Sequence, residues 1–471
     1  MSEPTSGVSA DRYLRLLVGI ATEKENTRHI EFAQDYARPF FKSISDRIGL
    51  TVDDKHGVDV LHFIDALAAI SVCQPQHEAI AVALSLVQSK SDKLGVNLHV
   101  ATNGEDVPPS TVAHLQLVWL ILAKIGQGAA AREKSGLSHR TTEEKAAYDE
   151  LQATICSFSM AKFRYRFNIY SLAADESLTR NPSADKILLR CPKRVHVSNP
   201  TGSQTKGLAI AKHLPKFFAL DKHILALYRI AKAPYFASLF HSTCNVDAVP
   251  GQKRTVTLDF AKDLRDALDS SRTTSTRLRS RATSTQLRSP KRLAEALLRD
   301  MTTANLAPLK NPQSIHCECA LVSHLHRKQC AVNDAKKKAG SLPIHPYIGV
   351  SKLSCYGCQL FLDAYLFALK DQKTRFKPFF TRGSHNKLYA YWVSPVLKDD
   401  AIRGRTQGTL RSFAQARFGM YVRTYSYNNK QRRPRLGSDS KGPSGKYEPV
   451  TSQEESNGDE GCSGIDTATD H

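Results

Sequence analysis

Half of the ten cysteines in this chain lie between residues 317 and 358, and no other feature restricts its fold as strongly. Ten cysteines in 471 residues are too few for a scaffold held together by disulfides. In a reducing compartment, thiols gathered in this way favour metal binding. We therefore expect a metal site in the C-terminal half, centred on His316, Glu318, Cys355 and Cys358.

The spacing of these four residues suits a catalytic zinc site. Cys355 and Cys358 are three residues apart at the start of a predicted helix, which places both sulfurs on one face. The helix dipole there favours the thiolate form that binds metal. His316 adds a nitrogen from a second helix start, and three ligands leave the fourth tetrahedral position open for water. Glu318 lies close enough in sequence to move a proton between that water and a leaving amine.

Two other interpretations of these residues stay open. Cys317 and Cys319, together with Cys355 and Cys358, offer the four thiolates of a closed structural zinc site. That set fits a helix less well, because Cys317 and Cys319 would point to different sides of it. The cysteines could also be buried free thiols that bind no metal.

Residues 293–427 are expected to form an α/β domain around this site. The predicted helices have apolar residues at helical spacing and are Leu293–Met301, His316–Gln329, Cys355–Ala368 and Leu410–Phe418. The predicted strands are Tyr347–Val350, Phe379–Arg382 and Tyr389–Val393. Helices that alternate with short strands indicate a layered α/β architecture.

Residues 11–270 are expected to be mainly helical and to form an interaction or support region, preceded by disorder at residues 1–10. Helical periodicity predicts the helices Asp59–Val72, His77–Ser89, Thr111–Ile125 and Leu208–Phe240. The apolar core of the third helix, Leu115–Ile125, is too short to span a membrane and is expected to be buried. The chain starts without a secretory pattern, so we expect an intracellular protein with no membrane partner.

Positive charge is concentrated late in the chain. Residues 271–450 contain 33 Lys and Arg against 10 Asp and Glu, a net charge of +23. The whole chain carries +21, so the other residues together are slightly acidic. Within this part, residues 271–292 are rich in Ser, Thr and Arg and are expected to be a flexible basic linker. Residues 428–471 are expected to be a disordered tail, and its basic cluster Asn429–Arg435 could be a nuclear localisation signal. Either a polyanionic partner such as a nucleic acid or simple solvation explains the charge, and the location is expected to be cytoplasmic or nuclear.

Three segments together resemble a known family. These are Ile315–Glu318, the stretch Ile348–Lys352 that leads into Cys355-x-x-Cys358, and Thr381–Tyr389 with Trp392 and Pro395 beyond it. In this order they are similar to the fungal OTT_1508-like deaminase family of the cytidine deaminase-like superfamily. The resemblance covers roughly residues 293–400.

The resemblance implies a fold, a metal and a set of roles. The fold is a three-layer α/β/α deaminase-like domain with a mixed sheet, here preceded by a mainly helical N-terminal region. The implied zinc ligands are His316, Cys355 and Cys358, with Glu318 as proton shuttle, and Arg382 and His385 are possible substrate-binding residues. Ser354 departs from the proline that many superfamily members have before the first cysteine. The superfamily also has a β-hairpin before the helix of the H-x-E motif, which we expect earlier in the chain, in a stretch that includes Arg254–Leu258.

The function implied is hydrolytic removal of the exocyclic amine of a nucleobase, in a nucleotide or a nucleic acid. Aromatic residues between 376 and 392 could include one that stacks on a base, but core and strand packing is the favoured explanation for them. The rival interpretation is a non-catalytic protein in which zinc stabilises a domain that binds partners or nucleic acid.

Overall fold

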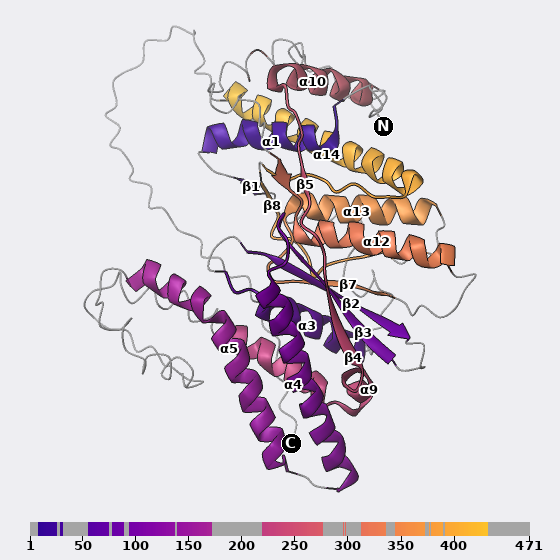
Figure 1. Cartoon of the computed structure of the whole chain (residues 1–471). Helices are drawn as coiled ribbons and strands as arrows, with labels where there is room; N and C mark the ends of the chain where they lie inside the picture. The colour runs from indigo at the N-terminus through magenta and orange to yellow at the C-terminus, as the bar shows by residue number, and fades with distance from the viewer. Residues whose placement is uncertain are drawn as a thin grey trace. The chain divides into compact units, whose positions relative to one another are not determined.

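The computed structural model describes residues 8–25, 29–31, 55–74, 78–88, 94–136, 139–171, 219–276, 295, 297, 312–335, 344–372, 376, 378–389 and 391–431. The chain divides into two compact units, Met1–Val422 and Arg423–His471. The sheet, the residues of the predicted metal site and the helices around them all lie in the first unit. This unit has a mixed α/β fold (Figure 1).

A four-stranded mixed sheet, in the order β4-β3-β2-β7, forms the centre of the first unit. Its strands are β2 (Ile80–Gln88), β3 (Leu94–Thr102), β4 (Thr243–Ala248) and β7 (Ile344–Val350). β2 pairs antiparallel with both β3 and β7, and β3 pairs parallel with β4. Strands from both sides of the expected basic linker therefore share one sheet.

Strand alternation separates the two faces of this sheet. Ile80, Val82 and Leu84 of β2 join the main hydrophobic core, which also contains α3 (Lys55–Ile70) and α4 (Pro109–Lys134). The opposite face meets α12 (Cys317–Ala335), which contacts β2, β3 and β7. Helices thus cover both faces, as in the three-layer α/β/α arrangement that we predicted (Figure 1).

The predicted helix at His77–Ser89 was wrong, because this segment contains the strand β2. Ile80 to Leu84 are all buried, since β2 is hydrogen-bonded on both sides and covered on both faces. Such a strand loses the alternation of polar and apolar residues that identifies half-buried strands, and a short apolar run cannot be distinguished from a buried helix by periodicity.

The expected hairpin before the H-x-E helix is formed by β2 and β3, far earlier in the chain than Arg254–Leu258. The segment we favoured instead contributes β5 (Lys253–Arg254), which pairs with β6 (Gln313–Ser314) just before α12. Between β3 and α12 the chain contains α4 and the edge strand β4 of the same sheet.

Most predicted elements near the candidate site are present. The predicted helices correspond to α4, α12, α13 (Tyr356–Asp371) and α14 (Asp400–Gln431), and the strand Tyr347–Val350 lies within β7. The predicted strand Phe379–Arg382 is reduced to one bridge between Phe380 and Tyr347, and the last one is replaced by β8 (Lys387–Tyr389). Of Leu293–Met301 and Leu208–Phe240, the structure describes only part, and the described residues 295, 297 and 219–232 are helical.

The remaining elements pack around this frame. They are α1 (Ala10–Glu25), β1 (His29–Glu31), α5 (Thr142–Ser171), the 3₁₀ turn η2 (Pro234–Phe236), α9 (Ala237–Phe240) and α10 (Phe260–Thr276). β1 pairs antiparallel with β8. α10 extends six residues into the expected linker, and α14 extends four residues into the expected tail. The division of the chain into domains stays a prediction.

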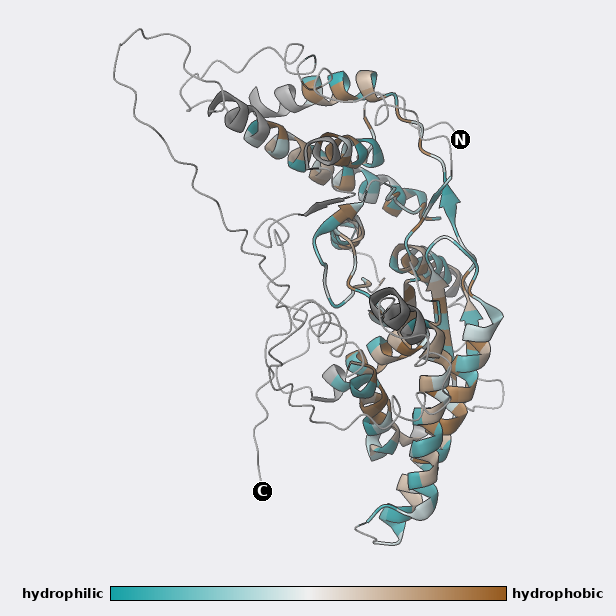
Figure 2. Cartoon of the chain, turned by 90° about the vertical axis from the view of Figure 1, so that its left-hand side faces the viewer, coloured by the Kyte–Doolittle hydropathy of each residue, from teal (hydrophilic) through white to brown (hydrophobic). Residues whose placement is uncertain are grey.

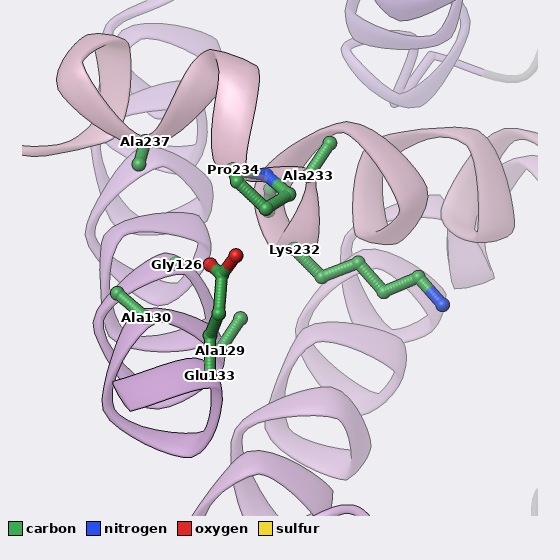
Figure 3. Close-up of a pocket in the computed structure, with 9 residues that line it drawn as sticks. Gly126, Ala129, Ala130, Glu133, Lys232, Ala233, Pro234 and Ala237 are labelled. Atoms are coloured by element: carbon green, nitrogen blue, oxygen red, sulfur yellow. The ribbon is translucent and has the colours of Figure 1, made fainter. Parts of the chain in front are cut away.

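The helix α4 is long and apolar enough to cross a membrane by length and composition, but half of its most apolar window is buried within the chain. A core helix meets the same criterion, and the tip where α4 turns into α5 is coloured hydrophilic in Figure 2. A hollow of about 110 Å³ lies between α4 and residues 231–237 (Figure 3). Glu133 and Lys232 border it, and none of the residues of the predicted metal site does.

Candidate metal centre and active site

The three predicted zinc ligands meet at one point in the structure. The Nδ1 atom of His316 lies 3.4 Å from Sγ of Cys355 and 3.3 Å from Sγ of Cys358. The two sulfur atoms are 3.3 Å apart. Both cysteines are buried, and His316 is half-buried. One nitrogen and two sulfurs therefore converge within the distances that a single ion bridges.

The local backbone explains how each ligand is placed. Cys355 is the N-cap residue of α13, with an extended backbone, and its sulfur accepts a hydrogen bond from the backbone N–H of Cys358. His316 immediately precedes α12, and its carbonyl accepts the first bond of that helix from Ala320. The three predicted ligands thus lie at two helix starts.

Asn103 connects the start of α12 to the hairpin. Its Oδ1 atom accepts a hydrogen bond of 2.8 Å from the backbone N–H of Cys317 and satisfies one of the open donors at this helix end. Asn103 follows directly after β3, so the hairpin helps to fix His316 and Glu318. Sequence reasoning missed this residue, because 214 positions separate it from its partner.

The donor atoms fit a soft divalent cation such as zinc. Burial raises the pKa values of the Cys355 and Cys358 thiols well above their ordinary value. In these surroundings thiolates need a compensating positive charge, and a dication held by both sulfurs and the imidazole supplies it. Two thiolates with one imidazole form a set that zinc prefers among biological divalent cations.

The described residues do not form the alternative closed site of four thiolates. Cys317 donates a hydrogen bond of 3.3 Å to Oε2 of Glu318 and does not belong to the cluster of His316, Cys355 and Cys358. Cys319 is fully buried and hydrogen-bonds to Cys358, but it too lies outside the cluster. The arrangement leaves a coordination position that no protein donor of this cluster fills.

Glu318 is placed in the first turn of α12 and is buried, with 5% of its surface exposed. It follows His316 by two residues, and its Oε2 atom accepts a hydrogen bond from the Cys317 thiol. A buried carboxylate beside an open metal position is suited to carry protons during hydrolysis.

The sulfur of Cys358 also has a side-chain hydrogen-bond partner outside the predicted metal site. The indole Nε1 of Trp392 donates a hydrogen bond of 3.1 Å to this sulfur, and Trp392 is itself buried. Gly357 leaves room for the indole ring, since a Cβ atom there would lie 2.6 Å from it. Trp392 was part of the family resemblance, but the sequence assigned it no role.

The two possible substrate-binding residues lie on different sides of the segment that follows Phe380. Arg382 is exposed, and its Nη1 atom lies 3.8 Å from Oδ2 of Asp65 on α3. The backbone N–H of His385 donates to the carbonyl of Ser354, directly before the first cysteine ligand. The His385 ring lies 5.8 Å from that of Tyr389, which in turn lies 6.4 Å from the ring of His316. His385 and Tyr389 thus border the metal cluster, while Arg382 points toward α3, and a role in substrate binding stays a prediction for both residues.

Residues 315–396 match the family model described as OTT_1508-like deaminase. No curated protein and no solved structure matches the chain. The matched stretch begins directly before His316, ends just beyond Trp392, and contains the three clustered donors together with Glu318, Arg382 and His385. On this comparison, the part of the chain that forms the metal cluster is similar to a family of deaminases.

Proposed function

We propose that the protein is a zinc-dependent deaminase of the cytidine deaminase-like superfamily, which hydrolyses the exocyclic amine of a nucleobase. The observation that carries this proposal is the cluster of His316, Cys355 and Cys358 with the buried carboxylate of Glu318 beside it, inside a segment similar to deaminases. A zinc ion held by these three donors would supply Lewis acidity at this point.

The chain's own residues supply the proton transfers. Water adds to the ring carbon that carries the amine, and Glu318 takes the proton released from that water. The same carboxyl group gives this proton to the ring nitrogen next to that carbon, then takes the proton of the added hydroxyl and passes it to the amine nitrogen, which leaves as ammonia while the carbon becomes a carbonyl. Cys317 holds Glu318 in place through the bond to Oε2. Burial of this carboxylate keeps bulk water from competing for the proton.

Basic residues near Arg382 support a phosphate-bearing substrate. His223 is affected by the positive charges of Arg382, Lys162, His62 and Lys222, which come from four separate segments. Burial, and to a smaller extent these charges, lower the pKa of His223 to about 4. Because Arg382 lies in the segment similar to deaminases, this gathering of positive charge suits a nucleotide or a nucleic acid better than a free nucleoside.

The test compares wild type with Glu318→Gln, using Glu133→Gln as a matched control at an exposed position of α4. We expect ammonia release by wild type and the control, and a loss of about 100- to 10,000-fold in Glu318→Gln. All three proteins should bind the same amount of zinc, because Glu318 is not a ligand. Nucleosides, nucleotides, single-stranded DNA and RNA, each with cytosine or adenine, form the substrate panel.

Two outcomes would contradict this proposal. Equal ammonia release by Glu318→Gln and wild type would remove the role of the carboxylate. Zinc binding without ammonia release from any member of the panel would favour the non-catalytic alternative, in which the metal only stabilises a partner-binding or nucleic-acid-binding domain.

A further inference from the structure

A second cluster of possible metal ligands lies farther along α12. His326 and Cys330 are one helical turn apart on this helix, and Asp399 immediately precedes α14. One donor atom from each of the three lies within 4.8 Å of the others. We propose that His326, Cys330 and Asp399 bind a second divalent metal ion, zinc by the nature of the donors, which joins α12 to the start of α14.

The distances agree with shared coordination. The Nε2 atom of His326 lies 3.6 Å from Sγ of Cys330. Zinc bonds of about 2.0–2.1 Å to nitrogen and about 2.3 Å to sulfur at a tetrahedral angle place these two atoms about 3.5 Å apart. The corresponding separations in the cluster at His316 are 3.3 and 3.4 Å. The nitrogen–sulfur distance in the second cluster is therefore similar to those in the first.

The other ring nitrogen of His326 has the partner that a metal-bound histidine needs. Nδ1 lies 3.0 Å from the hydroxyl of Tyr365, a buried residue of α13. When Nδ1 carries the proton and donates it to this hydroxyl, Nε2 keeps a lone pair directed toward Cys330. The ring is further held by Phe376, whose centroid lies 5.2 Å away. Tyr365 and Phe376 thus fix both the tautomer and the orientation.

Asp399 has one carboxylate oxygen available for the ion. Its Oδ1 atom accepts a hydrogen bond of 2.9 Å from the backbone N–H of Ile402 and so caps α14. Among the described residues, Asp399 forms no ion pair with a lysine or an arginine. Its charge, the Cys330 thiolate and a neutral imidazole together balance a dication. Cys330 and Asp399 are half-buried, so the ion can enter and can keep a water ligand.

A third cluster of possible metal ligands is unsuited to metal binding, because its groups already have other partners. His99, Asp247 and His324 also converge, but Lys328 already pairs with Oδ2 of Asp247. Arg327 donates to Nδ1 of His324 at 3.1 Å, so the proton of this imidazole must sit on Nε2, the atom that faces Asp247. Hydrogen bonds and ion pairs thus satisfy this cluster without metal.

The experiment measures zinc per chain after zinc loading and removal of unbound metal. Because the second site is separate from the proposed active site, the Cys355→Ser/Cys358→Ser variant is used as the background. We expect one zinc per chain in this background and none when Cys330→Ser is added. Wild type should hold two, Cys330→Ser alone one, and the matched control Cys156→Ser, at another half-buried cysteine, two. Retention of the same zinc content after Cys330→Ser, in either background, would overturn the proposal.

A second measurement needs no substitution and so does not depend on the variants folding. Alkylation of cysteines in wild type, followed by mass spectrometry, should be slowed about tenfold at Cys330 when zinc is added, because the bound thiolate is no longer nucleophilic. Cys156 should react at an unchanged rate. An equal rate at Cys330 with and without zinc would exclude the site even if the first site binds metal normally.

Discussion

At the scale of single residues, the environment of one sulfur atom distinguishes the two cysteine ligands. The sulfur of Cys358 receives the side-chain indole N–H of Trp392, whereas the sulfur of Cys355 receives the backbone N–H of Cys358. Hydrogen bonds to a thiolate draw charge from it and hold its direction toward a metal. Of these two N–H donors, only the one that Cys358 receives belongs to a side chain and can be removed by substitution.

Replacing Trp392 tests this support. Trp392→Phe keeps an aromatic ring beside Gly357 but removes the donor, and we expect zinc affinity to fall by about 10- to 100-fold. Trp119→Phe is the matched control, since Trp119 is also buried but lies on α4. Competition with a chelator measures the affinity, and the thiolate-to-metal absorption of the cobalt-loaded proteins should shift only in Trp392→Phe. Equal affinity and equal spectra for the two variants would show that the indole acts through packing alone.

At the scale of elements, the sequence predicts helices with local signals and misses strands that depend on distant partners. The spacing of Cys355 and Cys358 and the apolar residues after them suffice for α13, and His316 with Glu318 marks the start of α12. Nothing local indicates that β2 lies between β3 and β7, because Ile80 to Leu84 are buried on every side. Local sequence signals also suffice to predict a site at His316, Glu318, Cys355 and Cys358. They do not suffice for the contacts of Asn103 and Trp392, which depend on partners distant in the sequence.

A buried histidine between α4 and α5 makes the packing of these helices sensitive to pH. His114 stacks on Phe158 with centroids 3.8 Å apart, and burial lowers its pKa from 6.5 to about 4. Between these two values the unfolded chain binds a proton that the folded chain does not. The free energy of unfolding therefore falls as the pH drops from about 6.5 toward 4, and His114 accounts for about 2 kcal/mol of the fall at pH 5.

The variant His114→Gln removes this part of the acid sensitivity. Urea unfolding at pH 7.5 and at pH 5 should show a smaller loss of stability for this variant than for wild type. The exposed His139 provides the control, since His139→Gln should lose as much stability as wild type. If His114→Gln and wild type lost equal amounts of stability over this pH range, the titrating group would have to lie elsewhere.

At the scale of the whole molecule, the candidate active site depends on both halves of the chain. The sheet that supports α12 takes three of its four strands from before residue 249 and only β7 from the segment similar to deaminases. Asn103 caps α12, and Asp65 of α3 accepts hydrogen bonds from the Tyr347 hydroxyl and the Val350 N–H of β7. At Gly349 a Cβ atom would lie 2.5 Å from the backbone of Ile64, so α3 and β7 are in direct contact.

Residues 293–427, the domain expected from the sequence, should therefore not fold on their own. Without β2 and β3, the strand β7 has no antiparallel partner and the face of α12 that packs on the sheet is left in water, so cooperative packing is lost. We expect this fragment to show no cooperative thermal unfolding and no stable zinc binding, whereas residues 8–431 should show both. Calorimetry and metal analysis of the two fragments make the comparison. A cooperatively folded, zinc-binding fragment 293–427 would contradict this and would mean that the hairpin only extends the domain. We expect the opposite, because a fold that lacks its central strand retains neither the helix start that carries His316 nor its alignment with the two cysteines.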